Sequence, residues 1–417
     1  MTPPEPTPGE LFRVFGRIGL LSFGGPAAQI ALMHRELVEE HPWLTEDQFL
    51  RALSLCMMLP GPEAMQLATY AGWRLRGTWG GLVAGGLFVL PGAFVIMVLA
   101  MIYTRLGDVP VVQAAFTGIK AAVIIIVLQA LAKVSGKALG SIGAWILAAS
   151  AFLALFVLGL PYPLIILAAA LYGAFFLPVQ TAPAPHVTRA KANTASTLLI
   201  WGALWAAPIA LVMALEQTFL TQIALFFSKL AVVTFGGAYA VLAYMTQTIV
   251  ADYGWISTAQ MIDALGLAET TPGPLILVTE FVALLAGYEQ GGIPMALAAG
   301  ALALWVTFIP CFLWIFLAGP FLEQIAARPR LSAALAAVTA AVVGVILNLA
   351  LWFGMHVLFG ETVDSAWLAA PLPLPASLDP RALALTVLAA GLLWGAKRGI
   401  VETLGLMACA GWAVSLI

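Results

Sequence analysis

Pro60-Gly61-Pro62 interrupts an apolar stretch that is long enough to cross a membrane, and the same three residues return in the second half of the chain as Pro272-Gly273-Pro274. Phe23-Gly24-Gly25 returns at the same offset in residue number as Phe235-Gly236-Gly237. Proline lacks the amide that a helix interior needs, and glycine relaxes the backbone, so each motif should break its helix. Two ordered pairs of breaks at one offset indicate a duplicated chain whose broken helices meet at the membrane midplane, which is how secondary transporters are built.

The composition is that of a membrane protein. Of the 417 residues, 62% are apolar and only 9% are charged, which leaves too few charges to solvate a globular surface. A net charge of −2 excludes a basic nucleic-acid surface, and no glycine-rich nucleotide loop is present. Cys56, Cys311 and Cys409 lie in apolar segments without the spacing of metal ligands. We therefore expect a protein of the lipid bilayer, without cofactor or metal, that is driven by gradients or by a partner.

Apolar runs of about 17 to 25 residues predict an all-α polytopic membrane protein with thirteen transmembrane helices. In the first half they lie near 10 to 33, 45 to 74, 78 to 103, 110 to 133, 141 to 158 and 161 to 178. A seventh lies near 196 to 215, and the second half contains helices near 219 to 245, 258 to 287, 291 to 318, 331 to 358, 381 to 396 and 399 to 416.

The charge distribution supports this count, because Lys and Arg should gather on the cytoplasmic side of successive spans. With the N-terminus in the cytoplasm, thirteen complete crossings place most basic residues inside and most acids outside. A re-entrant hairpin at either Pro-Gly-Pro segment would scatter the pattern. Six crossings, one unpaired crossing and six more make the second half inverted. The expected domains are an N-terminal repeat over 1–178, a cytoplasmic linker with the connecting helix over 179–215, and an inverted C-terminal repeat over 216–417.

The repeat extends beyond the breaks. Gly80 and Gly292 keep the offset of the two Pro-Gly-Pro motifs, whereas Pro91 and Pro310 match at a larger one, so we expect a seven-residue insertion between them.

The breaks are where an anion can bind. Each second half-helix begins just after its break and should present unpaired amides at a positive helix end, which selects anions. These are the amides of Glu63, Ala64 and Met65 in the first half, and of Leu275, Ile276 and Leu277 in the second. Simple kinking of the helices is the structural alternative, and duplication in register makes it the weaker one.

Cations and hydroxyls accompany the breaks. Arg17 and Lys229 match at the offset of the motifs and precede the Gly-Gly steps; they serve an ionic pathway, or they extend toward the membrane interface. Ser22 and Thr234 also match, and their hydroxyls either donate to an oxyanion or bond back to a helix carbonyl. Lys120 is a lone cation within the fourth predicted helix.

Acids near the breaks have two interpretations. Glu63 either caps its own half-helix or acts as a titratable gate for the anion, and Glu269 lies beside the other break. Gln66, one turn after Glu63, can orient either group. Proton coupling or gating is therefore assigned to Glu63, Gln66 and Glu269. The candidate substrate-binding residues are Arg17, Ser22, Gly24, Gly25, Pro60, Gly61, Pro62, Lys120, Lys229, Thr234, Gly236, Gly237, Thr271, Pro272, Gly273 and Pro274.

The sequence resembles the chromate transporter family in its long two-domain form, over essentially the whole chain. The matching segments are Ser22-Phe23-Gly24-Gly25-Pro26, Leu59-Pro60-Gly61-Pro62-Glu63, Ala68-Thr69-Tyr70, Phe235-Gly236-Gly237-Ala238-Tyr239-Ala240 and Ala268-Glu269-Thr270-Thr271-Pro272-Gly273-Pro274. The resemblance implies a bacterial inner-membrane protein with two halves of opposite orientation, which moves chromate outward and confers chromate resistance, with sulfate as the look-alike anion.

Other functions remain open at this point. Sulfate or molybdate can replace chromate, an anion channel would differ by unsaturable flux, and helix ends with Arg17 and Lys120 would also hold the phosphate of a lipid. The last alternative, a membrane enzyme, lacks a nucleophile with a base partner. A homodimer is expected only because such folds often form one.

Overall fold

The computed structural model describes every residue except 1–5, 108, 179–193, 236–237, 323–324, 326–327, 364, 366 and 417. The described chain is helical apart from one two-stranded sheet, which confirms the predicted helical class. It folds into two compact units. The first comprises Met1–Met101, Val179–Ala238 and Thr271–Ser332, and the second comprises Ile102–Pro178, Tyr239–Thr270 and Ala333–Ile417. Each unit therefore takes segments from both halves of the sequence repeat.

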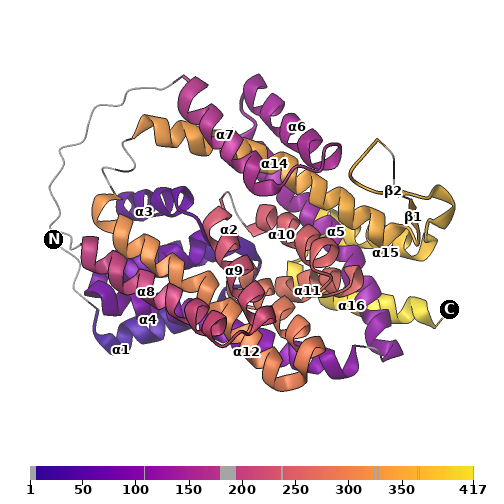
Figure 1. Ribbon diagram of the computed structural model, residues 1–417, viewed down its shortest axis with the longest axis horizontal. Coiled ribbons are helices and arrows are strands. Elements are labelled where there is room, and N and C mark those ends of the chain that lie inside the picture. The colour runs from indigo at the N-terminus through magenta and orange to yellow at the C-terminus, as the bar shows by residue number, and fades with distance from the viewer. Residues whose placement is uncertain are drawn as a thin grey trace. The chain divides into compact units, whose positions relative to one another are not determined.

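The first unit is built around the long helix α12, on which α8 and α9 pack (Figure 1). Trp201 of α8 stacks on Phe312 of α12 with ring centroids 5.6 Å apart, and Trp305 of α12 donates its indole N–H to the carbonyl of Leu204. The elements of this unit are α1 (Pro8–Leu21), α2 (Gly25–His34), the π-helix η1 (Arg35–Glu40), α3 (Glu46–Met58), most of α4 (Glu63–Leu106), α8 (Thr194–Ala214), α9 (Thr218–Val233), η3 (Leu275–Leu277), α12 (Val278–Ala318) and η4 (Gly319–Phe321).

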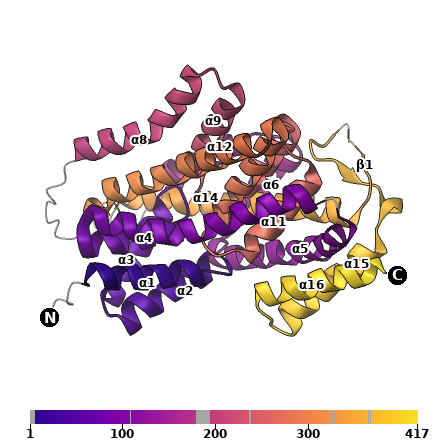
Figure 2. The ribbon, with the colours of Figure 1, turned by 90° about the horizontal axis from the view of Figure 1, so that it is seen from below.

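The second unit has its core where α15 and α16 pack against α5 (Figure 2). Its elements are the end of α4, α5 (Pro110–Ala138), α6 (Ile142–Phe156), α7 (Tyr162–Phe176), α10 (Ala238–Gln247), the π-helix η2 (Thr248–Asp252), α11 (Thr258–Thr270), α14 (Pro329–Leu358), β1 (Thr362–Val363), β2 (Leu372–Pro373), η5 (Pro375–Ser377), α15 (Pro380–Ala390), η6 (Gly391–Gly395) and α16 (Ile400–Ser415). The antiparallel pair β1 and β2 lies between the predicted helices over 331 to 358 and 381 to 396.

Five stretches among the described residues are long and apolar enough to cross a membrane, namely α4, α5, α8, the run Leu275–Phe321 and α14. Helices α4 and α12 each contain a turn with non-helical backbone angles, at Arg76–Gly77 and Gly291–Gly292, close to the predicted boundaries at 74–78 and 287–291. The chain is thus a multi-pass membrane protein. Shorter apolar helices account for further predicted spans, and the total of thirteen stays a prediction.

The first predicted span is not a single crossing. Arg17 Nη1 lies 3.4 Å from Glu36 Oε1, although a continuous helix would separate these two residues by about 28 Å at 1.5 Å per residue. The chain therefore folds back between α1 and α2, where Gly24 has a left-handed φ of 83°. The prediction of one helix over 10 to 33 is wrong, because the Gly-Gly break reverses the chain instead of only bending it.

Local structure repeats between the two halves. Thr45 opens α3 with a capping box, and Ser257 opens α11 with the same reciprocal hydrogen bonds. The π-helices η1 and η2 occupy matching positions, and each is followed by a tryptophan, Trp43 or Trp255, whose amide donates across the turn at 3.1 Å. The sequence repeat is therefore also a repeat of backbone conformation.

The turn inside the long helices corrects one detail of the alignment. Gly77 has φ 61° and ψ −158°, and Gly292 has φ 65° and ψ −156°. Gly77 is therefore the counterpart of Gly292, not Gly80 as the uninterrupted offset predicts. The difference in residue number between matching positions of the two halves thus increases twice. It increases first between the Pro-Gly-Pro motifs and this turn, and again between the turn and the pair Pro91 and Pro310. The single insertion that we expected is therefore two shorter insertions.

Helix α5 should depend on Gly118 for its contact with α16. A Cβ atom at Gly118 would come within 1.7 Å of the carbonyl oxygen of Met407, whereas one at Gly136 of the same helix would meet nothing within 4 Å. Overpacking of this kind costs about 1–3 kcal/mol. We expect Gly118→Ala to lower the unfolding temperature of the purified protein in detergent, and Gly136→Ala to leave it unchanged or raise it, because alanine is the better helix former. Equal unfolding temperatures for the two variants would contradict this packing.

Candidate functional site

The predicted breaks are present wherever the motifs lie among described residues. Helices α1 and α2 are separated at 22–24, α3 and α4 at 59–62, and α11 and η3 at 271–274, while α9 ends just before Thr234. Gly236 and Gly237 lie outside the described residues.

The breaks of the two halves are joined by reciprocal hydrogen bonds. The amide of Gly61 donates to the carbonyl of Thr234, and the amide of Gly273 donates to the carbonyl of Ser22, both at 2.9 Å. The two bonds are equivalent under the sequence repeat. Gly61 and Gly273 have φ values of 121° and 90°, a region that favours glycine. The structure thus brings the Pro-Gly-Pro segment of each half to the Phe-Gly-Gly segment of the other, within the first unit.

Two glutamines hold the broken segments in place. Gln29 is 2% exposed, and its Nε2 donates to the carbonyl of Gly273 at 2.7 Å and to that of Ser22 at 3.3 Å. Gln66 is fully buried and donates from Nε2 to the carbonyl of Pro60 at 2.7 Å. Sequence reasoning included Gln66 but missed Gln29. The available signal was a lone amide side chain shortly after the Gly-Gly step, in an otherwise apolar helix.

The hydroxyls at the breaks bond back to their own helices. Ser22 Oγ donates to the carbonyl of Ile18, and Thr234 Oγ1 donates to that of Leu230, both at 2.5 Å. This is the structural alternative considered for both residues. Each oxygen can still accept a hydrogen bond, but the proton is engaged, so either hydroxyl would have to rotate before it could donate to an anion.

The two Pro-Gly-Pro breaks differ in exposure. Residues 271–280 are all buried, whereas Pro60, Pro62 and Glu63 are only partly buried. Helix α4 begins at Glu63, directly after the first break, while the second half passes through the 3₁₀ turn η3 before α12 begins. Open amides at a helix start are therefore a feature of the first break more than of the second.

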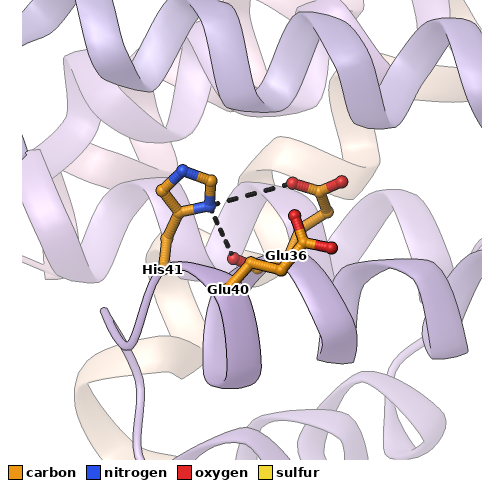
Figure 3. Close-up of side chains that lie close together, drawn as sticks. All are labelled: Glu36, Glu40 and His41. Atoms are coloured by element: carbon orange, nitrogen blue, oxygen red, sulfur yellow. Dashed lines mark hydrogen bonds and ion pairs between the residues drawn. The ribbon is translucent and has the colours of Figure 1, made fainter.

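Arg17 is engaged by two acids of its own hairpin, Glu36 and Glu40, which lie close to His41 (Figure 3). Arg17 Nη1 lies 3.4 Å from Glu36 Oε1 and 3.6 Å from Glu40 Oε2. Glu36, Glu40 and His41 each place one ligand-type atom within 4.8 Å of the others, a spacing that also suits a metal ion. However, the guanidinium already sits against both carboxylates, and His41 Nδ1 lies 3.1 Å from the carbonyl of Glu36. We therefore interpret this cluster as an ion pair.

Lys120 also has an acidic partner. Its Nζ lies 3.1 Å from Asp263 Oδ1, and Tyr103 donates to Asp263 Oδ2 at 2.8 Å. Sequence reasoning missed Asp263 and Tyr103, because Asp263 is distant in the chain from both Tyr103 and Lys120 and only tertiary packing brings the three together. All three residues lie in the second unit, so the structure does not group Lys120 with the breaks. Lys229 is on α9 of the first unit and is exposed.

The two candidate acids lie in different units. Glu63 is partly buried at the start of α4. Glu269 is 5% exposed near the end of α11 in the second unit, where Tyr239 donates to its Oε1 at 2.7 Å.

His34, at the end of α2, lies between two further acids. Its Nε2 is 2.6 Å from Glu46 Oε2 and its Nδ1 is 3.1 Å from Glu39 Oε1. These interactions, the hydrogen bond with Glu46 above all, raise the pKa of His34 above its usual value.

A helical multi-pass membrane protein with broken helices that cross at a shared point belongs to the class of membrane transport proteins. The family model described as Chromate transporter matches residues 9–174 and 221–413. The chromate transport protein of Pseudomonas aeruginosa is 33% identical over 99% of this chain and 94% of its own length. The chromate transport protein of Cupriavidus metallidurans is 32% identical over 83% of this chain and 82% of its own length. No solved structure matches the chain.

The chain belongs to the chromate transporter family, and it is a transporter rather than an enzyme.

The raised pKa of His34 makes the stability of the α2–α3 segment dependent on pH. A histidine whose pKa is higher in the folded state stabilises fully below its unfolded pKa, about 6.5, and loses that contribution as pH rises through the folded pKa. We expect His34→Gln to lower the unfolding temperature at pH 6 and to have little effect at pH 9. His356→Gln is the control, because His356 contacts the carbonyl of Trp352. A His34→Gln effect of the same size at both pH values would contradict the ion pairs.

Proposed function

We propose that the protein carries chromate out of the cell and that the crossed breaks form its binding site. The observation that supports this most is the reciprocal pair of hydrogen bonds, Gly61 to Thr234 and Gly273 to Ser22. These bonds join the Pro-Gly-Pro segment of each half to the Phe-Gly-Gly segment of the other half. Two relatives are chromate transport proteins, and on this likeness we take chromate as the substrate.

A tetrahedral dianion needs several convergent donors, and broken helices supply them without adding charge. The first-turn amides of α4 follow Pro62 and have no acceptor within their own helix, and they lie at the positive end of the helix dipole. Helix α2 starts in the same way after Gly24. In this proposal Gly25, Pro60, Thr271, Pro272 and Pro274 shape the backbone of the cradle, while Lys229 contributes positive potential from α9.

The membrane potential favours export of a dianion. With the inside negative, moving each charge across 100 mV is worth about 2.3 kcal/mol, so a dianion gains about 4 to 5 kcal/mol. Outward transport by a carrier is then downhill without ATP and would give chromate resistance.

The transport cycle that fits a duplicated fold is alternating access. We propose that the chain lies in a bacterial inner membrane with its N-terminus in the cytoplasm and its second repeat inverted relative to the first, and that α1 and α2 form a hairpin in place of the first predicted crossing. The two halves would rock about the crossed breaks and open the cradle to each side in turn. A homodimer is compatible with this arrangement. A further form of the proposed cycle is the exchange of chromate for protons or for sulfate.

Proton coupling is tested through the two acids nearest the motifs. If Glu63 or Glu269 carries the coupled proton, then Glu63→Gln or Glu269→Gln should flatten the pH dependence of chromate transport between pH 6 and pH 8. Tyr239→Phe is the matched control, since it keeps the Glu269 carboxyl and removes only its 2.7 Å hydrogen bond; it should shift the pH profile without flattening it. Unchanged profiles in both glutamine variants would remove proton coupling at these acids from the proposal.

The function itself is tested by uptake of radiolabelled chromate into inverted vesicles at a set membrane potential. Saturable uptake should follow an inside-positive potential. Gly61→Ala should reduce it about tenfold or more, because the residue would be strained at φ 121° and its Cβ would lie 2.8 Å from Gln66 Nε2. Gly254→Ala is the control, because it also places alanine at a positive φ, 61°, but with nothing within 4 Å of its Cβ, and it should transport normally.

Three outcomes of this uptake measurement would count against the proposal. Absence of uptake would reject chromate as the substrate. Inhibition by a small excess of sulfate would move the assignment to sulfate. Unsaturable flux would indicate a channel.

A further inference from the structure

We propose that the two breaks have different roles: the first, at Pro60-Gly61-Pro62, binds the oxyanion with the help of the Thr307 hydroxyl, and the second is structural. This inference deepens the proposed function and rests on it. It names a binding residue from the opposite half of the chain, and it predicts one bound oxyanion per chain instead of two.

Each break packs against the proline-containing helix of the other half. A Cβ at Gly61 would lie 2.9 Å from Cys311 Sγ, and Cys311 is next to Pro310 in α12. In the matching place, Gly273 lies beside Gly92, next to Pro91 in α4. Cys311 and Gly92 are equivalent in the repeat, since each directly follows its proline, so the two environments can be compared directly.

The second break is enclosed by buried groups, because Gln29 donates to the Gly273 carbonyl and the Leu277 side chain and the backbone of α4 lie against Gly273. A Cβ at Gly92 would approach the carbonyl oxygen of Pro272 to 2.1 Å and a methyl of Leu277 to 2.6 Å. The carbonyl oxygen of Phe88, a fully buried residue of the same helix, would lie 3.3 Å from a Cβ at Gly273. All residues from 271 to 280 are buried, whereas Pro60, Pro62 and Glu63 are partly exposed. This difference in burial is what assigns the second break a structural role.

The first break is lined by polar groups that are not fully used. Thr307 Oγ1 and the amide oxygens of Gln66 and Gln29 are buried and have no hydrogen-bond partner within the described part of the chain. The two amide oxygens can only accept, so the Thr307 hydroxyl is the one of these groups that can donate to an oxyanion. Gln66 is fully buried beside Gly61, and Thr307 is 2% exposed. Cys311 Sγ, which touches the first break, donates to the Thr307 carbonyl at 3.3 Å. Thr307 is therefore one helical turn from the residue that contacts Gly61, on the same face of α12.

The free hydroxyl of Thr307 is unusual among the buried threonines of this unit. Thr69 donates to the carbonyl of Met65 at 2.9 Å, and Thr279 donates to that of Ile276 at 2.8 Å, which is how a hydroxyl in a membrane helix is normally satisfied. Buried polar groups without partners are rare and need an explanation. A substrate oxygen that accepts from Thr307 provides one.

The counterpart of Thr307 in the first half is Phe88, at the offset that relates Pro91 to Pro310. The counterparts of Glu63 and Gln66 in the second half are Leu275 and Val278, at the offset of the Pro-Gly-Pro motifs. After the breaks, and at the position of Thr307, polar side chains of the first break thus replace apolar ones of the second. Before the breaks the order is reversed, since Glu269 and Thr271 match Met57 and Leu59.

The test is equilibrium binding of radiolabelled chromate to the purified full-length chain in lipid nanodiscs. Thr307→Val keeps the shape of the side chain and removes the hydroxyl, so the affinity should fall about 10- to 100-fold, as for a lost hydrogen bond to a charged group. Thr307→Ser should stay close to the wild type. Thr279→Val is the matched control, because that hydroxyl is bonded back to its own helix. Wild type should bind one chromate per chain.

Several outcomes would overturn this inference. They are an unchanged affinity in Thr307→Val, an equal loss in Thr307→Val and Thr307→Ser, and two chromate ions bound per chain. If Thr307→Val does not fold, Thr307→Ala makes the same test with a smaller side chain, and wild-type affinity in that variant is equally decisive. If the wild-type protein binds no chromate, the proposed function itself is refuted. If the wild type binds chromate and a Thr307 variant binds it equally well, only the role of Thr307 is refuted.

Discussion

Backbone groups that a broken membrane helix releases must find partners inside the protein, because hydrocarbon offers none. In this chain the two halves supply those partners to each other: Gly61 donates to Thr234, and Gly273 donates to Ser22. A buried amide left without an acceptor costs about 1–3 kcal/mol, which is a large share of a typical folding stability of about 5–15 kcal/mol. Each half therefore depends on the other for the integrity of its own breaks.

This exchange explains why the compact units do not coincide with the sequence repeats. The described parts of all four break motifs lie in the first unit, although two of the motifs come from each half of the chain. The left-handed φ values of Gly61 and Gly273 turn their amides toward the opposite half, a conformation in which most other residues would be strained. The duplicated sequence thus encodes one joint assembly, in which the breaks are the points of contact.

Much of the architecture could be predicted from the sequence, because apolar length and proline or glycine positions act locally. The bounds of α5, α7 and α14 and the sites of the breaks agree closely with expectation. The reversal at Gly24 could not be predicted, since hydrophobic patterning gives the extent of a helix and not its direction. The partners of Arg17 and Lys120 were also beyond reach, because pairs such as Lys120 and Asp263 are set by tertiary packing. From the sequence, Gln29 could be recognised only as an isolated polar residue in an apolar segment.

Charge balance suggests why neutral donors suit such a site. Two of the cations that the sequence offered as anion ligands are neutralised by the chain itself, Arg17 by Glu36 and Glu40, and Lys120 by Asp263. A bare cation in the membrane interior is costly, and a carrier has to reorient when it is empty as well as when it is loaded. Helix-end amides and a hydroxyl can hold an anion through oriented dipoles and leave no unpaired charge after it departs. The charge moved in each cycle would then be that of the substrate alone, which lets the membrane potential act on the full charge of the dianion.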